Sequence, residues 1–144
     1  MGKVFTVQVK GLQGVIARNN AFIKNVSDKT DELLNKTANK IETDAQALCK
    51  VSSIAGTIAV SVNAKNDYQI NAGDGLDNPA IAAYTEFGTG NFAASLVPTL
   101  PQDWQAYAKT FYINGLGRLP GAPYMYPAFS SNTVMTVDQI KQII

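Results

Sequence analysis

The sequence predicts an α+β domain in which one long amphipathic helix packs against a small antiparallel sheet. Two patterns support this prediction. Apolar residues recur every three or four positions between residues 29 and 49, which is typical of one helix face. After Lys50 they alternate with polar residues, which is typical of strands. A long irregular insertion and a short C-terminal helix complete the predicted fold.

Composition favours a single domain over residues 1–144 and excludes several classes of protein. A chain of 144 residues can bury a core without covalent cross-links. The only cysteine, Cys49, excludes an internal disulfide. No apolar run is long enough to span a bilayer, and the N-terminus lacks the apolar stretch of a signal peptide. We therefore expect a soluble protein with no membrane partner.

The N-terminal third predicts a strand followed by helix. Residues 4–9 alternate apolar and polar side chains as a half-buried strand does, and residues 12–26 suggest a short helix. Ser27 or Asp28 should cap the long helix at residues 29–49, because such side chains accept hydrogen bonds from the free N–H groups of a first turn. The apolar stripe of this helix consists of Leu34, Ala38, Ile41, Ala45 and Leu48.

Three lysines, Lys29, Lys36 and Lys40, fall on roughly the opposite face of the long helix. A solvated outer face accounts for them. Contact with phosphate is the alternative, and it would make the protein a weak nucleic-acid binder. Because the net charge is only +1 and no sequence-reading motif is present, we expect at most weak, non-specific binding of duplex DNA.

The middle of the chain predicts a hairpin and a short helix. Residues 57–62 and 68–72 alternate as paired strands do, and a turn-rich connection follows. Asn78 should cap a two-turn helix, with Pro79 in its first position. The helix should end near Phe87, where Gly88 can adopt the left-handed conformation. A buried strand is the alternative, since short apolar runs are ambiguous.

Residues 91–119 form an insertion that Pro98, Pro101 and several glycines interrupt, with one helical segment predicted at residues 103–112. The insertion is rich in large apolar side chains and carries only three charges. In water it would expose a large apolar patch, which monomers avoid. We therefore predict an assembly arm that contacts neighbouring subunits, with Trp104 as its anchor. Residues 137–144 should form a short amphipathic helix.

Aromatic residues and charges are unevenly distributed. Ten of the thirteen aromatic residues lie between residues 84 and 129, whereas the first 50 residues hold 13 of the 23 charges. Aromatic enrichment with few charges marks interface centres, although about half of these aromatic side chains should form the domain's own core. The predicted subunit or partner contacts are Tyr84, Glu86, Phe87, Phe92, Trp104, Tyr107, Phe111, Tyr112, Tyr124 and Tyr126.

Motifs for catalysis, metals or cofactors are missing. Without histidine there is no Ser-His-Asp triad, no Cys-His pair and no common zinc site. Gly88-Thr89-Gly90 resembles part of a dinucleotide fingerprint but lacks the required strand and helix context. Glu86 should instead be a structural acceptor for backbone N–H groups or a neighbouring subunit. The alternative is a small enzyme that uses Glu86 in a pocket with Tyr84 and Tyr124.

Two sequence blocks resemble a known family. "AYTEFGTG" at residues 83–90 and "APYMYPAF" at residues 122–129 are similar to the signature blocks of small neck and tail-component proteins of long-tailed bacteriophages. The predicted order of elements agrees with that family along nearly the whole chain. One departure is the segment "CKVSSIAGTIAV", which lacks the Pro and Thr-Gly-x-Leu-Arg motif of many relatives.

The resemblance implies a structural, non-enzymatic virion protein without cofactors, assembled in the host cytoplasm. It implies a homo-oligomeric ring, such as a hexamer or dodecamer, that takes part in tail completion or head-tail joining. The implied partners are head-completion, tail-terminator or tail-tube proteins, with duplex DNA passing through the lumen. Four residues are expected to shape the backbone of the two blocks and their flanks, namely Pro79, Gly88, Pro123 and Pro127.

Overall fold

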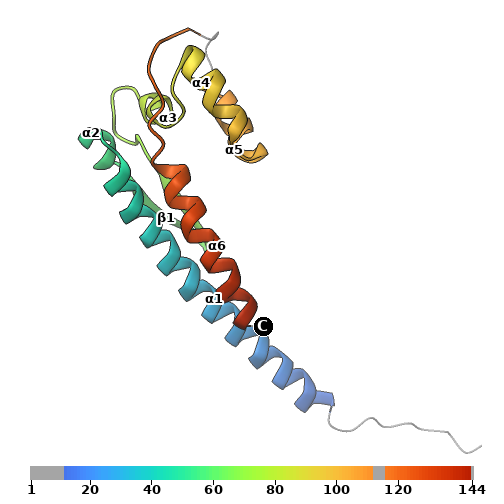
Figure 1. Cartoon of the computed structure of the whole chain (residues 1–144). Helices are drawn as coiled ribbons and strands as arrows, with labels where there is room; N and C mark the ends of the chain where they lie inside the picture. The colour runs from blue at the N-terminus through green and yellow to red at the C-terminus, as the bar shows by residue number, and fades with distance from the viewer. Residues whose placement is uncertain (1–11, 112–115, 144) are drawn as a thin grey trace, which may run out of the picture.

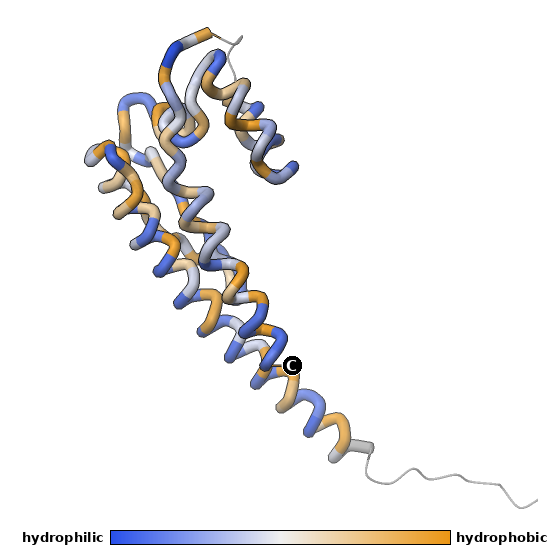
Figure 2. Tube along the Cα trace, viewed as in Figure 1, coloured by the Kyte–Doolittle hydropathy of each residue, from blue (hydrophilic) through white to orange (hydrophobic). Residues whose placement is uncertain are grey.

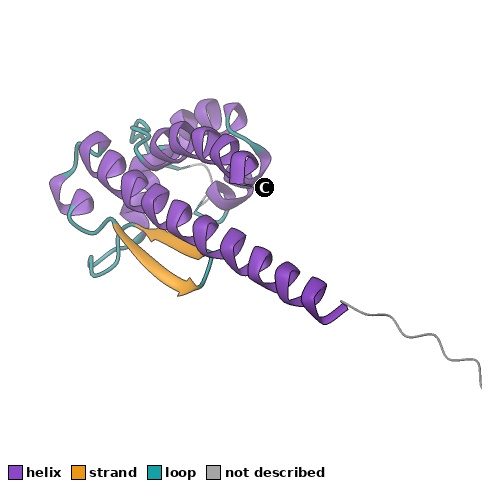
Figure 3. Ribbon diagram, turned by 90° about the horizontal axis from the view of Figure 1, so that it is seen from below, coloured by secondary structure: helices purple, strands orange, loops and turns teal. Residues whose placement is uncertain are grey.

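The computed structural model describes residues 12–111 and 116–143, and it has the predicted α+β fold (Figure 1). Two long helices lie side by side, and a two-stranded antiparallel sheet packs against the first of them (Figures 1 and 3). The predicted strand at residues 4–9 lies outside the described residues. The elements are α1 (Leu12–Leu48), α2 (Ser52–Ala55), β1 (Ala59–Ala64), β2 (Asp67–Asn71), α3 (Ala80–Phe87), α4 (Gly90–Leu96), the 3-10 helix η1 (Val97–Thr99), α5 (Gln102–Lys109) and α6 (Met125–Ile143).

The first helix is longer than predicted, because residues 12–26 and 29–49 form one continuous element. The predicted break at residues 27 and 28 is wrong. No glycine or proline interrupts residues 15–48, and the expected capping side chains have other partners. Asp28 binds Lys24 and Lys65, and Ser27 accepts a hydrogen bond from Asn66. The polar groups that suggested a cap instead attach the hairpin to a helix interior.

Helix α6 packs antiparallel on the predicted apolar stripe of α1. Residues 38, 41 and 45 of the stripe are buried, whereas Leu48 is exposed and Cys49 takes the buried position. The Thr37 and Thr136 hydroxyl oxygens lie 2.7 Å apart, and the Asn132 amide donates to Asp44 at 2.9 Å. These polar pairs fix the register of the two helices.

The predicted hairpin is confirmed. Val60 pairs with Ile70, and Lys65 and Asn66 form the turn, in which Asn66 has a positive φ of 64°. Further contacts hold the strands on α1, because Glu42 accepts a hydrogen bond from the Val60 N–H at 2.9 Å and the Tyr68 hydroxyl donates to Asp31 at 3.0 Å.

The turn of the hairpin is attached to α1 through Asp28. Hydrogen bonds from Lys24 and then Lys65 lower the pKa of Asp28 from 3.8 to about 2. A carboxyl whose pKa is lower in the folded state stabilises the fold above its unfolded pKa, and this stabilisation disappears as the pH falls through the folded pKa.

We therefore expect the Asp28→Asn variant to melt at a lower temperature than the wild type above pH 3.8, with the difference narrowing as the pH falls to about 2. Thermal melts over this range measure the difference. An unchanged gap in Tm at every pH would show that the ion pairs do not stabilise the hairpin.

Two hydrophobic clusters make up the interior. The first lies between α1, the hairpin, α3 and α6 and contains Ile41, Ala45, Cys49, Ile54, Ile58, Ala82, Tyr124 and Ala128. The second joins the predicted arm to the ends of α3 and α6 and contains Phe87, Ala93, Val97, Leu100 and Ala108, with Trp104 and Tyr126 packed against it.

The predicted arm at residues 91–119 is therefore more ordered than its sequence suggested. Helices α4 and α5 occupy much of it, and α5 overlaps the predicted segment at residues 103–112. Pro98 and Pro101 do not break these helices, because each stands at the start of one, where a proline removes no intrahelical hydrogen bond. Residues 116–124 run back to α6 without regular structure.

The C-terminal helix begins earlier than the apolar pattern of residues 137–144 indicated. It starts at Met125, so the aromatic-proline block forms its first turns. Pro127 fits there because first-turn N–H groups have no intrahelical acceptor.

Candidate functional site: the junction of α3 and α6

Helix α3 brings the first signature block into the core. Its helical structure and its end at Phe87 are as predicted, and the alternative of a buried strand is wrong. The predicted side-chain cap by Asn78 is not formed, and Pro79 occupies the N-cap position instead of the first helical position. The Asn78 carbonyl, not its side chain, accepts the Ile81 N–H at 3.1 Å.

The buried carboxylate of Glu86 holds the start of α6. Its Oε2 accepts hydrogen bonds from the N–H groups of Tyr124 at 2.7 Å and Met125 at 2.8 Å, and its Oε1 accepts the Tyr126 N–H at 2.9 Å. The side chain is only 3% exposed. First-turn N–H groups lack intrahelical acceptors and carry the positive end of the helix dipole. A carboxylate supplies the acceptors and the opposite charge. Glu86 is a long-range cap that links two elements.

Burial determines the protonation behaviour of Glu86. It raises the pKa of the carboxyl above its ordinary value, while the three backbone hydrogen bonds act in the opposite direction. Both oxygens already accept hydrogen bonds from the backbone. This arrangement matches the predicted structural acceptor, with backbone N–H groups as the donors.

Tyr124 joins the same two blocks from the other side. It is 1% exposed, and its hydroxyl donates to the Ala82 carbonyl at 2.9 Å. Burial raises the pKa of this hydroxyl above its ordinary range. One residue before Pro123, the Ala122 N–H donates to the Thr85 carbonyl at 2.8 Å. The last turn of α3 is thus bonded to the entire approach to α6.

Two glycines let the backbones meet beyond the end of α3. Gly88 has φ 77° and ψ −176°, so the predicted positive φ is confirmed, but the conformation is not the left-handed helical one. A Cβ at Gly88 would lie 2.6 Å from the Gly121 nitrogen. Thr89 continues the contact, because its N–H bonds the Leu119 carbonyl and its Oγ1 accepts the Leu119 N–H, both at 2.8 Å.

Sequence reasoning identified Glu86 and Gly88 but missed the partners on the approach to α6, namely Leu119, Gly121 and Ala122. The available signal was the pairing of the two blocks in the family resemblance.

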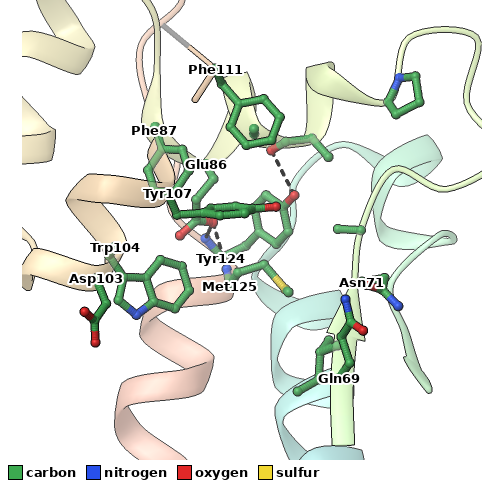
Figure 4. Close-up of a pocket in the computed structure, with 15 residues that line it drawn as sticks. Gln69, Asn71, Glu86, Phe87, Asp103, Trp104, Tyr107, Phe111, Tyr124 and Met125 are labelled. Carbon is green, nitrogen blue, oxygen red and sulfur yellow. Dashed lines mark hydrogen bonds between the residues drawn. The ribbon is translucent and has the colours of Figure 1, made fainter. Parts of the chain in front are cut away.

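A cleft of about 390 Å³ opens beside the junction, between the hairpin and the second hydrophobic cluster (Figure 4). Gln69 and Asn71 of β2 line one side, and aromatic side chains line the other. The principal aromatic and carboxylate residues of the lining are Glu86, Phe87, Asp103, Trp104, Tyr107, Phe111 and Tyr124. We call this space the cleft.

The described residues among the predicted contacts divide into three groups by their exposure. Glu86, Phe87 and Tyr124 are buried within the chain. Phe92 and Tyr107 are 48% and 58% exposed. Partly buried positions are Tyr84, Trp104, Phe111 and Tyr126, and Tyr112 lies outside the described residues.

Trp104, the predicted anchor of the arm, packs inside the subunit. The centroid of its ring lies 5.1 Å from the ring centroid of Tyr126, 5.7 Å from that of Phe129 and 6.4 Å from that of Phe87. Buried aromatic pairs of this kind contribute about 0.5–1.5 kcal/mol each beyond their area. Trp104 therefore attaches α5 to α6.

The lysine face carries a mixed charge. Lys29, Lys36 and Lys40 are exposed, but Lys40 pairs with Asp44 at 3.1 Å. Within residues 12–111 and 116–143, no cluster of three potential metal ligands is found. None of the helices in that part of the chain combines the length and apolar character that crossing a membrane requires.

Comparison of the chain with protein-family models, curated proteins and solved structures finds no match in any of the three.

Proposed function

We propose that this protein is a self-associating structural component of a bacteriophage particle, forming a ring at the neck or tail end that takes part in tail completion or head-tail joining. The observation that carries the proposal is the α3–α6 junction. The two blocks that resemble the phage family, residues 83–90 and 122–129, make direct contact through Glu86, Tyr124 and the neighbouring glycines. In this chain the two blocks therefore form one structural unit.

The chemistry of the junction supports a structural role over the enzyme alternative. The Glu86 carboxylate already accepts three backbone N–H groups, and the Tyr124 hydroxyl already donates to a carbonyl. A carboxylate has about four lone-pair positions, and backbone N–H groups occupy three of those of Glu86, so little acceptor capacity is left for the proton of a substrate. The junction is better suited to holding α6 at a fixed angle to α3.

Exposed apolar side chains support self-association. They occur near the start of α1, on the outer side of α6 and around the arm. Those with large exposed fractions include Val15, Phe22, Ile23, Phe92, Tyr107, Leu116, Val134 and Met135. Clusters of exposed apolar side chains are typical of proteins that bury them against a partner. The mixed charge of the lysine face gives less support to nucleic-acid binding.

In this proposal, head-completion, tail-terminator or tail-tube proteins stack on the ring, and duplex DNA passes through its lumen. A nearly neutral chain suits such passage, because few lysines and arginines are available to hold phosphate.

Sedimentation velocity of the purified protein over a range of concentrations tests the proposal. We expect one discrete oligomer that forms cooperatively without added metal or cofactor. A monomer at every concentration and salt condition would contradict it.

A further inference from the structure

The N-terminal end of α1 extends beyond the elements that cover the rest of the helix (Figure 1). Thr37 pairs with Thr136, and α6 ends at Ile143. In an antiparallel pair with equal rise, α6 therefore ends opposite roughly residue 30 of α1. The hairpin turn contacts α1 at Ser27 and Asp28, through Asn66 and Lys65. We call residues 14–26 the projecting end.

The projecting end continues the apolar stripe that α6 covers elsewhere. Ile23 precedes the buried Ile41 by 18 residues, which is five full turns at about 100° per residue, and Ile16 lies one heptad earlier on nearly the same side. Yet Ile16 and Ile23 are 49% and 63% exposed, and their neighbours Val15 and Phe22 are 52% and 55% exposed. Figure 2 shows apolar segments recurring along this part of α1.

The cleft offers an apolar surface that such a helix face fits. Trp104, Tyr107 and Phe111 form its aromatic side, with the Tyr107 side chain 58% exposed at its edge. A volume of about 390 Å³ is in the range of binding pockets. It accommodates side chains that a helix inserts while the helix backbone stays outside.

Charge also distinguishes the two surfaces. Among the described residues that line the cleft, the charged ones are Glu86 and Asp103, and none is a lysine or arginine. More widely, residues 66–108 contain five acids and no basic residue. Residues 1–29 contain five basic residues and the single acid Asp28, a net charge of +4. Opposite potentials steer two surfaces together and disfavour the pairing of like surfaces.

We propose that the projecting end of α1 in one copy of this chain inserts its apolar stripe into the cleft of a second copy. The contact joins two different surfaces, so it is heterologous, and repeating it around an axis closes a ring. This inference rests on the proposed function, because it assumes that the chain forms an oligomer. It goes further by naming the two surfaces that form the contact.

The same contact cannot form within one chain. Tyr124, which lines the cleft, belongs to the same hydrophobic cluster as Ile41 of α1. Because α1 is one continuous helix, Ile23 lies 18 residues, roughly 27 Å, further along its axis. The projecting end of a chain is therefore held away from the cleft of that same chain.

Paired cysteine variants test the contact in the full chain, with Cys49→Ala as background. One subunit carries Ile23→Cys and the other carries Gln69→Cys, one of them with an affinity tag. After mild oxidation, we expect the mixture to form the mixed disulfide dimer at least fivefold more than either variant alone. A matched pair combines Ile23→Cys with Lys36→Cys, which is exposed on α1 away from the cleft, and should stay near background.

The outcomes separate this inference from the proposed function. If Ile23→Cys subunits link only to each other, the α1 helices pair symmetrically. That result would overturn the inference. An oligomer without any Ile23–Gln69 link would also overturn it and leave the proposed function standing. A monomer in every preparation would overturn both. As a check independent of disulfides, Ile23→Asp should weaken association at least tenfold while its monomer keeps the wild-type Tm, because the side chain is exposed.

Discussion

Replacing Glu86 with alanine is expected to destabilise the folded chain more than any other single side-chain truncation at the junction. The change leaves three first-turn N–H groups of α6 without their acceptor in a site where Glu86 is 3% exposed. Each unsatisfied buried donor costs about 1–3 kcal/mol, so the free energy of unfolding should fall by about 3 kcal/mol or more. Denaturant unfolding followed by circular dichroism measures it.

Two further variants identify the cause. Glu86→Gln keeps one oxygen, which can serve two donors, but directs an NH₂ group at the third, so its loss should be intermediate. Glu32→Gln removes an exposed acid from α1 and should leave stability within about 0.5 kcal/mol. Equal stability of the wild type and Glu86→Ala would show that the carboxylate does not hold α6.

Adding a single methyl group at Gly88 is the second large effect that we expect. Gly88→Ala combines strain at φ 77° with a Cβ placed 2.6 Å from the Gly121 nitrogen and 3.0 Å from the Leu119 carbonyl oxygen. Positive φ costs about 1–2 kcal/mol, and overpacking against backbone adds about 1–3 kcal/mol. We therefore expect a loss of about 3 kcal/mol, measured by denaturant unfolding.

Gly75 provides the matched control. Its φ is 80°, close to that of Gly88, but a Cβ there meets nothing within 4 Å. Gly75→Ala should therefore show the strain without the overlap and lose only about 1–2 kcal/mol. If the two substitutions cost the same, the close approach of the two blocks at Gly88 and Gly121 contributes nothing to stability.

These positions also show which parts of the structure local sequence patterns could predict. The hairpin, the apolar stripe of α1 and the end of α3 follow from spacings of two to four residues, and they were predicted. The continuity of α1 was not, because Ser27 and Asp28 favour a cap locally and only Lys65 and Asn66, more than 35 residues later, give them other partners. Long-range partners override local preference.

The junction was predictable in its chemistry but not in its geometry. Lack of histidine and of a second acid indicated that Glu86 accepts structural hydrogen bonds. Its donors lie 38 to 40 residues away, and no periodicity specifies them. Likewise, the aromatic composition of the arm could not distinguish core from contact. Trp104 packs against Tyr126, whereas Tyr107 remains largely exposed.

Electron microscopy of the purified protein, with averaging of single particles, tests the central claim most directly. The proposal of a phage neck or tail component predicts closed rings of uniform diameter with a central opening wide enough for duplex DNA. Single subunits without association, or open filaments that never close, would contradict it.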